Sequence, residues 1–127
     1  MDESKELRLS DSELKIMEQL WQEGDCTAKH LADVMGERWG WNINSTYTLI
    51  KRCIKKGAIE RREPGFVCRA LLSCSQVRQA ETDKLLGKLF GGSANLLFTA
   101  LLDEHRLSPA ELRQLRQKLD ELEEDAP

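Results

Sequence analysis

Residues 44–55 carry small polar and cationic side chains whose spacing would let them contact a nucleic acid together. Five of them, spaced i, i+4, i+7, i+8 and i+11, fall on one face of a helix, and a sixth lies in its exposed first turn. Small polar groups at the start of such a helix suit base edges in the major groove, whereas Lys and Arg further along suit phosphates. An ordinary solvent-facing amphipathic helix has the same pattern. The six residues are Asn44, Ser45, Thr48, Lys51, Arg52 and Lys55.

The charge of the 127-residue chain is unevenly distributed along its length. The formal net charge is only −3, from 19 Lys and Arg against 22 Asp and Glu. Residues 41–80 nevertheless carry 8 basic and 2 acidic side chains, whereas residues 1–40 carry 5 and 10, and residues 81–127 carry 6 and 10. A basic segment between acidic flanks is typical of a protein with an anionic partner such as a phosphate backbone. The alternative is a solvated basic face that pairs with the acidic flanks.

No arrangement of residues points to an enzyme or to a metal site. The two histidines, His30 and His105, are far apart in the sequence. Cys68 and Cys74 do not have the spacing of zinc ligands, and no second pair supports them. Walker A, GxGxxG and HExxH motifs are absent from the sequence. We therefore expect no catalytic residues, no metal and no cofactor.

The first residues and the cysteines indicate the compartment. Residues 1–5 are charged and no apolar run follows them, so nothing suggests export, and no run approaches the roughly 20 apolar residues of a membrane-spanning helix. We expect a cytoplasmic protein with no membrane partner. Cysteines of unexported proteins are normally reduced, so we expect free thiols at Cys26, Cys53, Cys68 and Cys74. We expect Cys68 and Cys74 to be small buried hydrophobic residues, with a redox or metal-sensing role as the alternative.

The elements that must position the polar face begin with two helices. Ser10 and Glu13 have the spacing of a capping box, which predicts a helix over residues 11–23. Thr27 can cap a second helix, which we expect Gly36 and Gly40 to break.

The polar face itself belongs to a third predicted helix. Asn42 or Asn44 can cap it, and its inner face is predicted to consist of Tyr47, Ile50 and Ile54. These inner residues leave the polar and cationic residues on the outer face.

A hairpin is expected after the third helix. Residues 58–62 and 66–71 are short, partly alternating segments on either side of a Pro-Gly turn. Three helices followed by a hairpin is the order of a winged helix-turn-helix domain, with Arg61 and Arg62 on a wing that can lie along a DNA backbone. We therefore predict a mainly α protein with a winged-helix DNA-binding domain over residues 1–74 and a helical dimerisation region over residues 75–127.

The C-terminal region is predicted to contain three helices, of which the last two carry more apolar side chain than a small winged-helix body can cover. Only residues 121–125 are expected to fray. Large exposed apolar patches mark interfaces, and symmetric dimers are the commonest oligomers, so we expect a homodimer. The alternative is a self-contained bundle within one chain. The expected interface residues are Leu97, Phe98, Leu101, Leu102, Leu112, Leu115, Leu119 and Leu122.

Segments along nearly the whole chain resemble a known family. They are Leu9–Glu13 with Met17–Trp21, residues 41–59, and residues 92–112. In sequence and order they are similar to the penicillinase repressor family (BlaI/MecI/CopY-type winged-helix regulators), in which an S-[DE]-x-E cap precedes a helix that ends in Trp. The resemblance implies a cytoplasmic bacterial transcriptional repressor that dimerises through its C-terminal helices and binds an inverted-repeat operator in double-stranded DNA.

The resemblance also indicates how the DNA is contacted. Family recognition helices use early Thr/Lys-type residues and a later Arg, which by position correspond to Asn44, Ser45, Thr48 and Arg52. Ile43 replaces the usual Pro and Asn44 a common Lys, so the preferred operator sequence can differ from that of the family. A winged-helix protein–protein interaction module without specific DNA binding remains the alternative function.

Two further departures concern induction. Lactam-responsive members are inactivated by a regulatory protease at an Asn-Phe bond, and the aligned bond here is Ala100–Leu101. Copper-responsive members carry C-x-C motifs at the C-terminus, whereas no cysteine follows Cys74 here. The family thus implies a possible regulatory protease as a partner, although this chain lacks the usual cleavage sequence. The copper switch is excluded.

Overall fold

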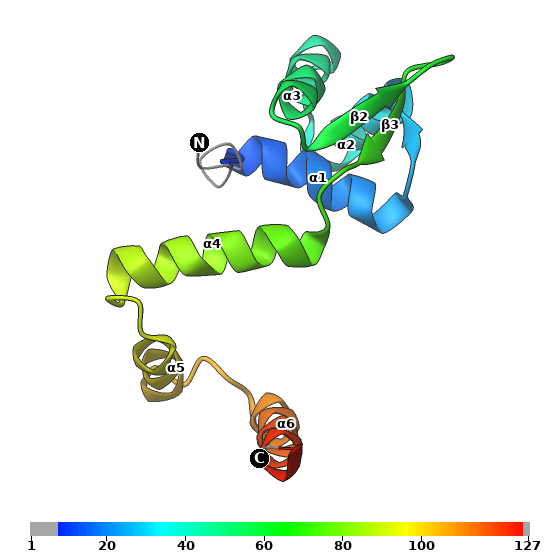
Figure 1. Cartoon of the computed structure of the whole chain (residues 1–127). Coiled ribbons are helices and arrows are strands. Elements are labelled where there is room, and N and C mark those ends of the chain that lie inside the picture. Colours follow the sequence, from blue (N-terminus) through cyan, green and yellow to red (C-terminus); the bar gives the residue numbers. More distant parts are fainter. Residues whose placement is uncertain (1–7, 126–127) are drawn as a thin grey trace. The chain divides into compact units, whose positions relative to one another are not determined.

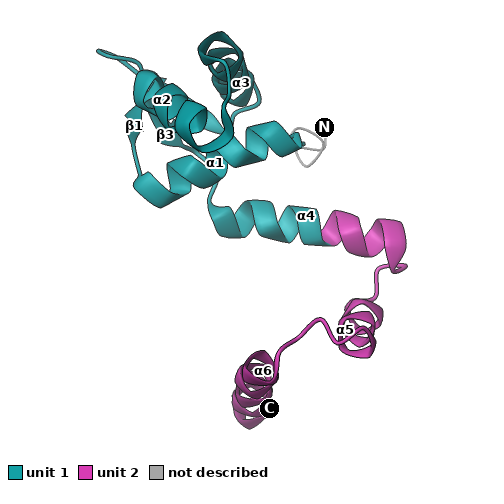
Figure 2. Cartoon of the chain, turned by 180° about the vertical axis from the view of Figure 1, so that it is seen from behind, with its two compact units in different colours: residues 1–82 teal, residues 83–127 magenta. Residues whose placement is uncertain are grey.

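The structure, a computed structural model, describes residues 8–125 and divides the chain into two compact units. The first unit comprises residues 1–82 and the second residues 83–127, so the boundary falls within helix α4 (Cys74–Leu89) (Figure 2). The sequence-based division after residue 74 lies just inside the start of this helix and precedes the boundary between the two units. The chain is mainly helical, as predicted.

The first unit is a three-helix body with a small sheet (Figure 1). Its helices are α1 (Asp11–Glu23), α2 (Ala28–Trp39) and α3 (Ile43–Lys55), followed by the start of α4. Its strands are β1 (Cys26–Thr27), β2 (Ile59–Arg62) and β3 (Val67–Ala70), which form an antiparallel sheet in the order β1-β3-β2. Strands β2 and β3 form the predicted hairpin. The core members with the largest fully buried side chains are Ile16, Met17, Leu20, Leu31, Met35, Ile50, Cys53, Ile59 and Cys68.

Local hydrogen bonds explain why α1 and α2 begin where the sequence predicts. The Ser10 hydroxyl oxygen accepts from the Glu13 amide at 3.1 Å, and the Ser10 amide donates to the Glu13 carboxylate at 2.8 Å. The Thr27 hydroxyl accepts from the His30 amide at 3.1 Å. Both caps satisfy amides that have no partner inside the helix.

The prediction that Gly36 breaks α2 is wrong. The helix continues through Gly36 to Trp39, and Gly40 ends it in the left-handed conformation (φ 69°, ψ 24°), with its amide bonded to the Gly36 carbonyl at 2.9 Å. A glycine inside a helix costs only about 1 kcal/mol relative to alanine. Burial of Met35 immediately before it favours the continuous helix.

The inner face of α3 differs from the predicted one. Its buried residues are Thr46, Ile50 and Cys53, whereas Tyr47 and Ile54 are only partly buried. Thr46 can be buried because its hydroxyl donates to the Asn42 carbonyl at 2.9 Å, which leaves no unsatisfied polar atom. The face is therefore rotated by a fraction of a turn from the one that apolar residues alone predict.

Strand β1 was not predicted. It consists of two residues, and it forms only because Cys26 pairs with Cys68 and Thr27 with Val67 of β3. A strand this short has no alternation to detect, so long-range pairing alone defines it.

The described part of the second unit contains the end of α4, α5 (Ala94–Asp103) and α6 (Pro109–Asp125). Ser93 caps α5, and Ser108 with Glu111 forms the predicted capping box at the start of α6. The tail 121–125 is helical rather than frayed, because α6 runs unbroken to Asp125. None of residues 83–125 is buried, so these helices do not form the core of a self-contained bundle within one chain.

A buried carboxylate joins the start of α1 to the end of α3. The Glu13 side chain is only 2% exposed, and it accepts from Lys56 Nζ at 2.6 Å as well as from the Ser10 amide. Burial raises the pKa of Glu13, but hydrogen bonds from Lys56 and Ser10 outweigh this effect and hold the pKa below its usual value. Glu13 is therefore ionised at neutral pH.

Replacing Glu13 with glutamine is expected to lower the free energy of unfolding by about 1.5–3 kcal/mol at pH 7, the range for hydrogen bonds to charged groups. Glutamine preserves the capping oxygen but not the charge that pairs with Lys56. Because folding lowers the pKa of Glu13, its contribution is complete above the unfolded pKa of about 4.3 and is lost as the pH falls through the folded pKa. Urea denaturation at several pH values measures the difference.

The matched control is Glu111→Gln, which changes a fully exposed capping box of the same type and is expected to have a smaller effect. The difference in free energy of unfolding between the wild type and Glu13→Gln should shrink at acidic pH. If it stays constant down to strongly acidic pH, the Glu13 charge is not the source of this stability.

Candidate nucleic-acid interface

The six predicted residues of α3 lie together on its outer side. Each is exposed, and we call this set the α3 surface. The polar members occupy the first two turns and the cations follow toward the C-terminal end, in the order the sequence predicts. The α3 surface consists of Asn44, Ser45, Thr48, Lys51, Arg52 and Lys55.

The first turn of α3 is fixed by its cap. The Asn42 carboxamide oxygen accepts from the amides of Asn44 and Ser45 at 2.8 and 3.2 Å. The Thr48 hydroxyl donates to the Asn44 carbonyl at 3.0 Å. Asn42 is therefore committed to the helix, whereas the side chains of Asn44 and Ser45 remain exposed and able to bond an external partner.

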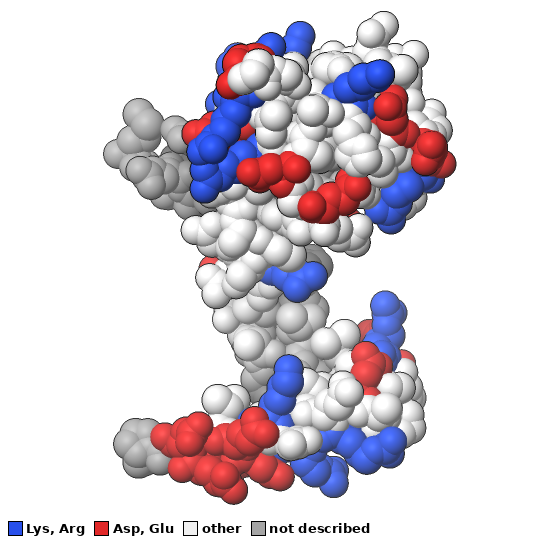
Figure 3. Space-filling model, turned by 90° about the vertical axis from the view of Figure 1, so that its right-hand side faces the viewer, with Lys and Arg blue, Asp and Glu red and all other residues white. Residues whose placement is uncertain are grey.

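The cations of the α3 surface have no acidic partner among the described residues. No ion pair in residues 8–125 involves Lys51, Arg52 or Lys55. Their positive charge is thus available to an anionic ligand. By contrast, acidic side chains gather at the C-terminal end of α6 (Figure 3), where Glu121, Glu123, Glu124 and Asp125 are all exposed.

The wing carries its predicted arginines, but each already has an acidic partner. Arg61 pairs with Glu63 and stacks over the Phe66 ring, 3.7 Å from its centroid, and Arg62 pairs with Glu60 at 2.7 Å. The Phe66 amide and the Arg61 guanidinium lower the pKa of Glu63, so this carboxylate is charged at neutral pH. The wing is therefore less basic than its arginines suggest, because Glu60 and Glu63 offset their charge.

If the wing lies along the DNA backbone, its arginines would meet phosphates rather than bases. The double substitution Arg61→Ala with Arg62→Ala is then expected to weaken binding to all DNA sequences by a similar factor, about threefold to tenfold, and to flatten the salt dependence. Titrations at two salt concentrations measure both effects. The matched variant Glu60→Gln with Glu63→Gln frees the same arginines and should strengthen binding. Altered base preference at an unchanged salt slope would contradict a role confined to the backbone.

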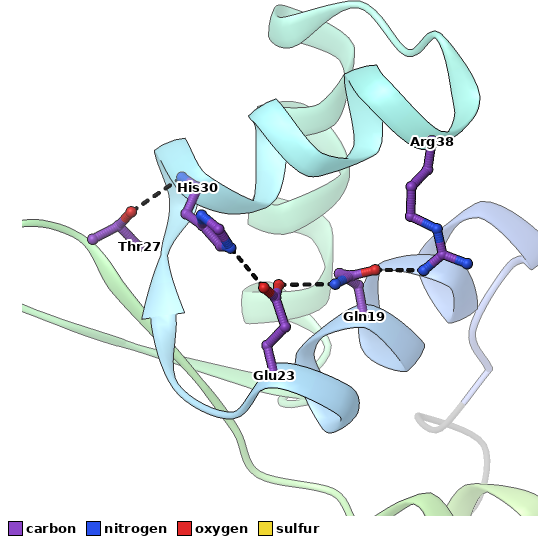
Figure 4. A network of polar contacts seen from close by, with 5 residues as sticks. All are labelled: Gln19, Glu23, Thr27, His30 and Arg38. Carbon is purple, nitrogen blue, oxygen red and sulfur yellow. Dashed lines mark hydrogen bonds and ion pairs between the residues drawn. The ribbon is translucent and has the colours of Figure 1, made fainter.

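A polar network holds α1 against α2, the two helices that support α3 (Figure 4). Glu23 accepts from His30 Nε2 at 2.7 Å and from Gln19 Nε2 at 2.8 Å, and Arg38 donates to Gln19 at 2.6 Å. Hydrogen bonding to Glu23 raises the pKa of His30. The network, in which Gln19 is buried and Glu23 and His30 are exposed, joins the two helices.

Cys53 and Cys68 are buried, whereas Cys26 and Cys74 are only partly buried, so the prediction of a buried Cys74 is wrong. All four are free. Burial raises the pKa of Cys53 to about 12 and that of Cys26 and Cys68 to about 11, so these three are protonated at neutral pH. In residues 8–125, no group of three or more His, Cys, Asp or Glu side chains could hold a metal ion. Within the same residues, no single helix is long and apolar enough to cross a membrane; only the bent pair α4 and α5 has the combined length and composition.

Comparison with known proteins identifies the family. The model of the penicillinase repressor family matches residues 9–121. The chain belongs to the penicillinase repressor family. The resemblance inferred from the sequence is thereby confirmed.

Individual members of the penicillinase repressor family are similar along nearly their whole length. The penicillinase repressor of Bacillus licheniformis is 25% identical over 116 residues, which cover 90% of this chain and 91% of the relative. The methicillin resistance regulatory protein MecI of Mammaliicoccus sciuri is 24% identical over 120 residues, which cover 93% and 98%. This similarity supports a transcriptional repressor.

A solved structure supports the winged-helix fold. The solution structure of the DNA-binding domain of the repressor BlaI matches with a TM-score of 0.51 and 25% identity, covering 54% of this chain and 87% of the BlaI domain. The predicted fold class is confirmed.

Proposed function

We propose that the chain is a dimeric, sequence-specific transcriptional repressor that binds an inverted-repeat operator through the α3 surface and the wing of each subunit. The observation that carries this proposal is the α3 surface: exposed polar side chains in the first turns of the third helix, followed by three cations without acidic partners in the described residues. In a winged-helix protein of a repressor family, this helix suits the major groove. Asn44, Ser45 and Thr48 would reach base edges while Lys51, Arg52 and Lys55 meet phosphates or guanine.

The dimer is supported by the apolar surface of the second unit. Leu102, Leu112, Leu119 and Leu122 are each at least 40% exposed, and Phe98 is 36% exposed. Leu97, Leu101 and Leu115 are half-buried. A patch of this extent usually marks an interface, and an inverted repeat requires a partner with twofold symmetry.

A regulatory protease remains part of the proposal for induction. The aligned bond Ala100–Leu101 lies inside α5, and both residues are half-buried. A protease would therefore have to unwind this helix locally before cutting it. Because the two residues differ from the Asn-Phe pair of lactam-responsive members, a different protease or inducer is proposed for this chain.

A mobility-shift assay tests the proposed function against the alternative of a protein-interaction module. The full chain is mixed with genomic DNA fragments at two salt concentrations, and the bound fragments are recovered and sequenced. A repressor should enrich a small set of fragments that share an inverted repeat, with affinity that falls steeply as salt rises. No enrichment, or binding that does not respond to salt, would favour the protein-interaction module.

A further inference from the structure

The first residue of α3 is a large apolar side chain that the protein leaves exposed. Ile43 is 54% exposed, whereas Ile50 in the same helix is fully buried. Single exposed apolar residues are common on protein surfaces, so exposure alone assigns no role. The position of Ile43 is what distinguishes it, because its chain neighbours in the same turn are the exposed polar residues Asn44 and Ser45 of the α3 surface.

Helix geometry directs the Ile43 side chain beyond the N-terminal end of α3, toward a ligand bound at that end. Every Cα–Cβ bond in an α-helix tilts toward the N-terminus, so the side chain of the first helical residue extends beyond the helix end. The Asn42 carboxamide bonds the amides of Asn44 and Ser45, and is therefore tied back to the helix. Ile43 is also branched at Cβ, which gives it few rotamers and a low entropic cost of being held in one orientation.

The ligand chemistry follows from the surroundings of Ile43. The same turn of α3 is polar at Asn44 and Ser45, and the helix is cationic further along at Lys51 and Arg52, which suits a polyanion better than an apolar protein groove. Among base edges in the major groove, the apolar group is the C5-methyl of thymine. The geometry points to Ile43 as a specificity-determining residue that packs against a thymine methyl in each half-site. This inference rests on the proposed function, because it needs the N-terminal end of α3 to enter the major groove.

Removal of the methyl group from the DNA tests the contact directly. A preferred site is first selected with the full-length chain from a randomised duplex library, and each thymine is then replaced in turn by deoxyuridine, which lacks only the C5-methyl. For the wild-type chain we expect one position per half-site where the replacement weakens binding about threefold to tenfold, the effect of losing roughly one buried methyl-sized contact.

The variant Ile43→Ala assigns that contact to its residue. It should bind the thymine and deoxyuridine duplexes equally at that position. Its affinity should be close to that of the wild type for a duplex in which this thymine is replaced in both half-sites, because the variant loses the contact in both subunits. The matched control is Leu71→Ala, which truncates a side chain of similar exposure outside α3 and should retain the wild-type response. Circular dichroism melting of both variants checks that each is folded.

Three outcomes would overturn the inference in distinguishable ways. If every deoxyuridine duplex binds the wild type as well as its thymine counterpart, no thymine methyl is read. If the loss persists in Ile43→Ala, another residue reads the methyl. If the library yields no enriched site at all, the proposed function fails and the inference fails with it.

Discussion

Replacing Arg52 with alanine is expected to abolish sequence-specific DNA binding without unfolding the chain. Arg52 is exposed on the α3 surface and has no ion pair among the described residues, so its loss removes nothing from the core. One arginine contact to guanine is worth about 1–3 kcal/mol, and a dimer on an inverted repeat makes it twice. The combined loss of roughly 2–6 kcal/mol corresponds to about 30-fold to 10⁴-fold weaker binding. Fluorescence anisotropy with the selected operator measures this change.

Control measurements separate a base contact from a general effect of charge. Arg78→Ala removes the same side chain from α4 and is expected to leave operator affinity nearly unchanged. Binding of Arg52→Ala to a scrambled duplex should fall much less than binding to the operator, because non-specific affinity depends on total charge. Unchanged operator affinity in Arg52→Ala would remove Arg52 from the proposed site.

Features that depend on neighbouring residues could be predicted from the sequence. The caps at Ser10 and Thr27 consist of hydrogen bonds between residues three apart, so the sequence contains both partners. The exposure of the α3 surface likewise followed from helical spacing, and all six residues are exposed. The order of polar and cationic residues along one helix can be predicted without knowing the rest of the fold.

Features that depend on distant contacts, or on which of several partners a side chain bonds, could not be predicted. Strand β1 exists through its pairing with β3, some 40 residues away. Thr46 is buried because its hydroxyl finds a backbone partner, which an apolar pattern does not indicate. The wing ion pairs of Arg61 and Arg62 depend on rotamers, which charge counting ignores. The sequence shows Ile43 only as a departure from the family pattern, whereas its exposure in the structure makes it a candidate contact.

The second large effect is expected on assembly. The leucines of α6 recur at helical spacing and form a leucine stripe that consists of Leu112, Leu115, Leu119 and Leu122. Leu119 is 51% exposed, so its replacement removes little packing within one chain. Full burial of a leucine contributes roughly 1.5–3 kcal/mol, and a symmetric dimer would bury the exposed half of two copies. Leu119→Glu should therefore weaken dimerisation at least about tenfold, and the additional cost of bringing two carboxylates into an apolar interface increases the effect.

Sedimentation equilibrium measures the dimer constant, and operator binding should weaken in parallel although α3 is unaltered, because a monomer can occupy only one half-site. The matched control is Gln114→Glu, which adds the same charge on an exposed polar position of α6 away from the leucine stripe and should leave the dimer intact. Equal dissociation in both variants would mean that charge rather than apolar burial governs assembly. A wild-type chain that remains monomeric at tens of micromolar would end the dimer proposal, and the exposed leucines of α5 and α6 would then require a different partner.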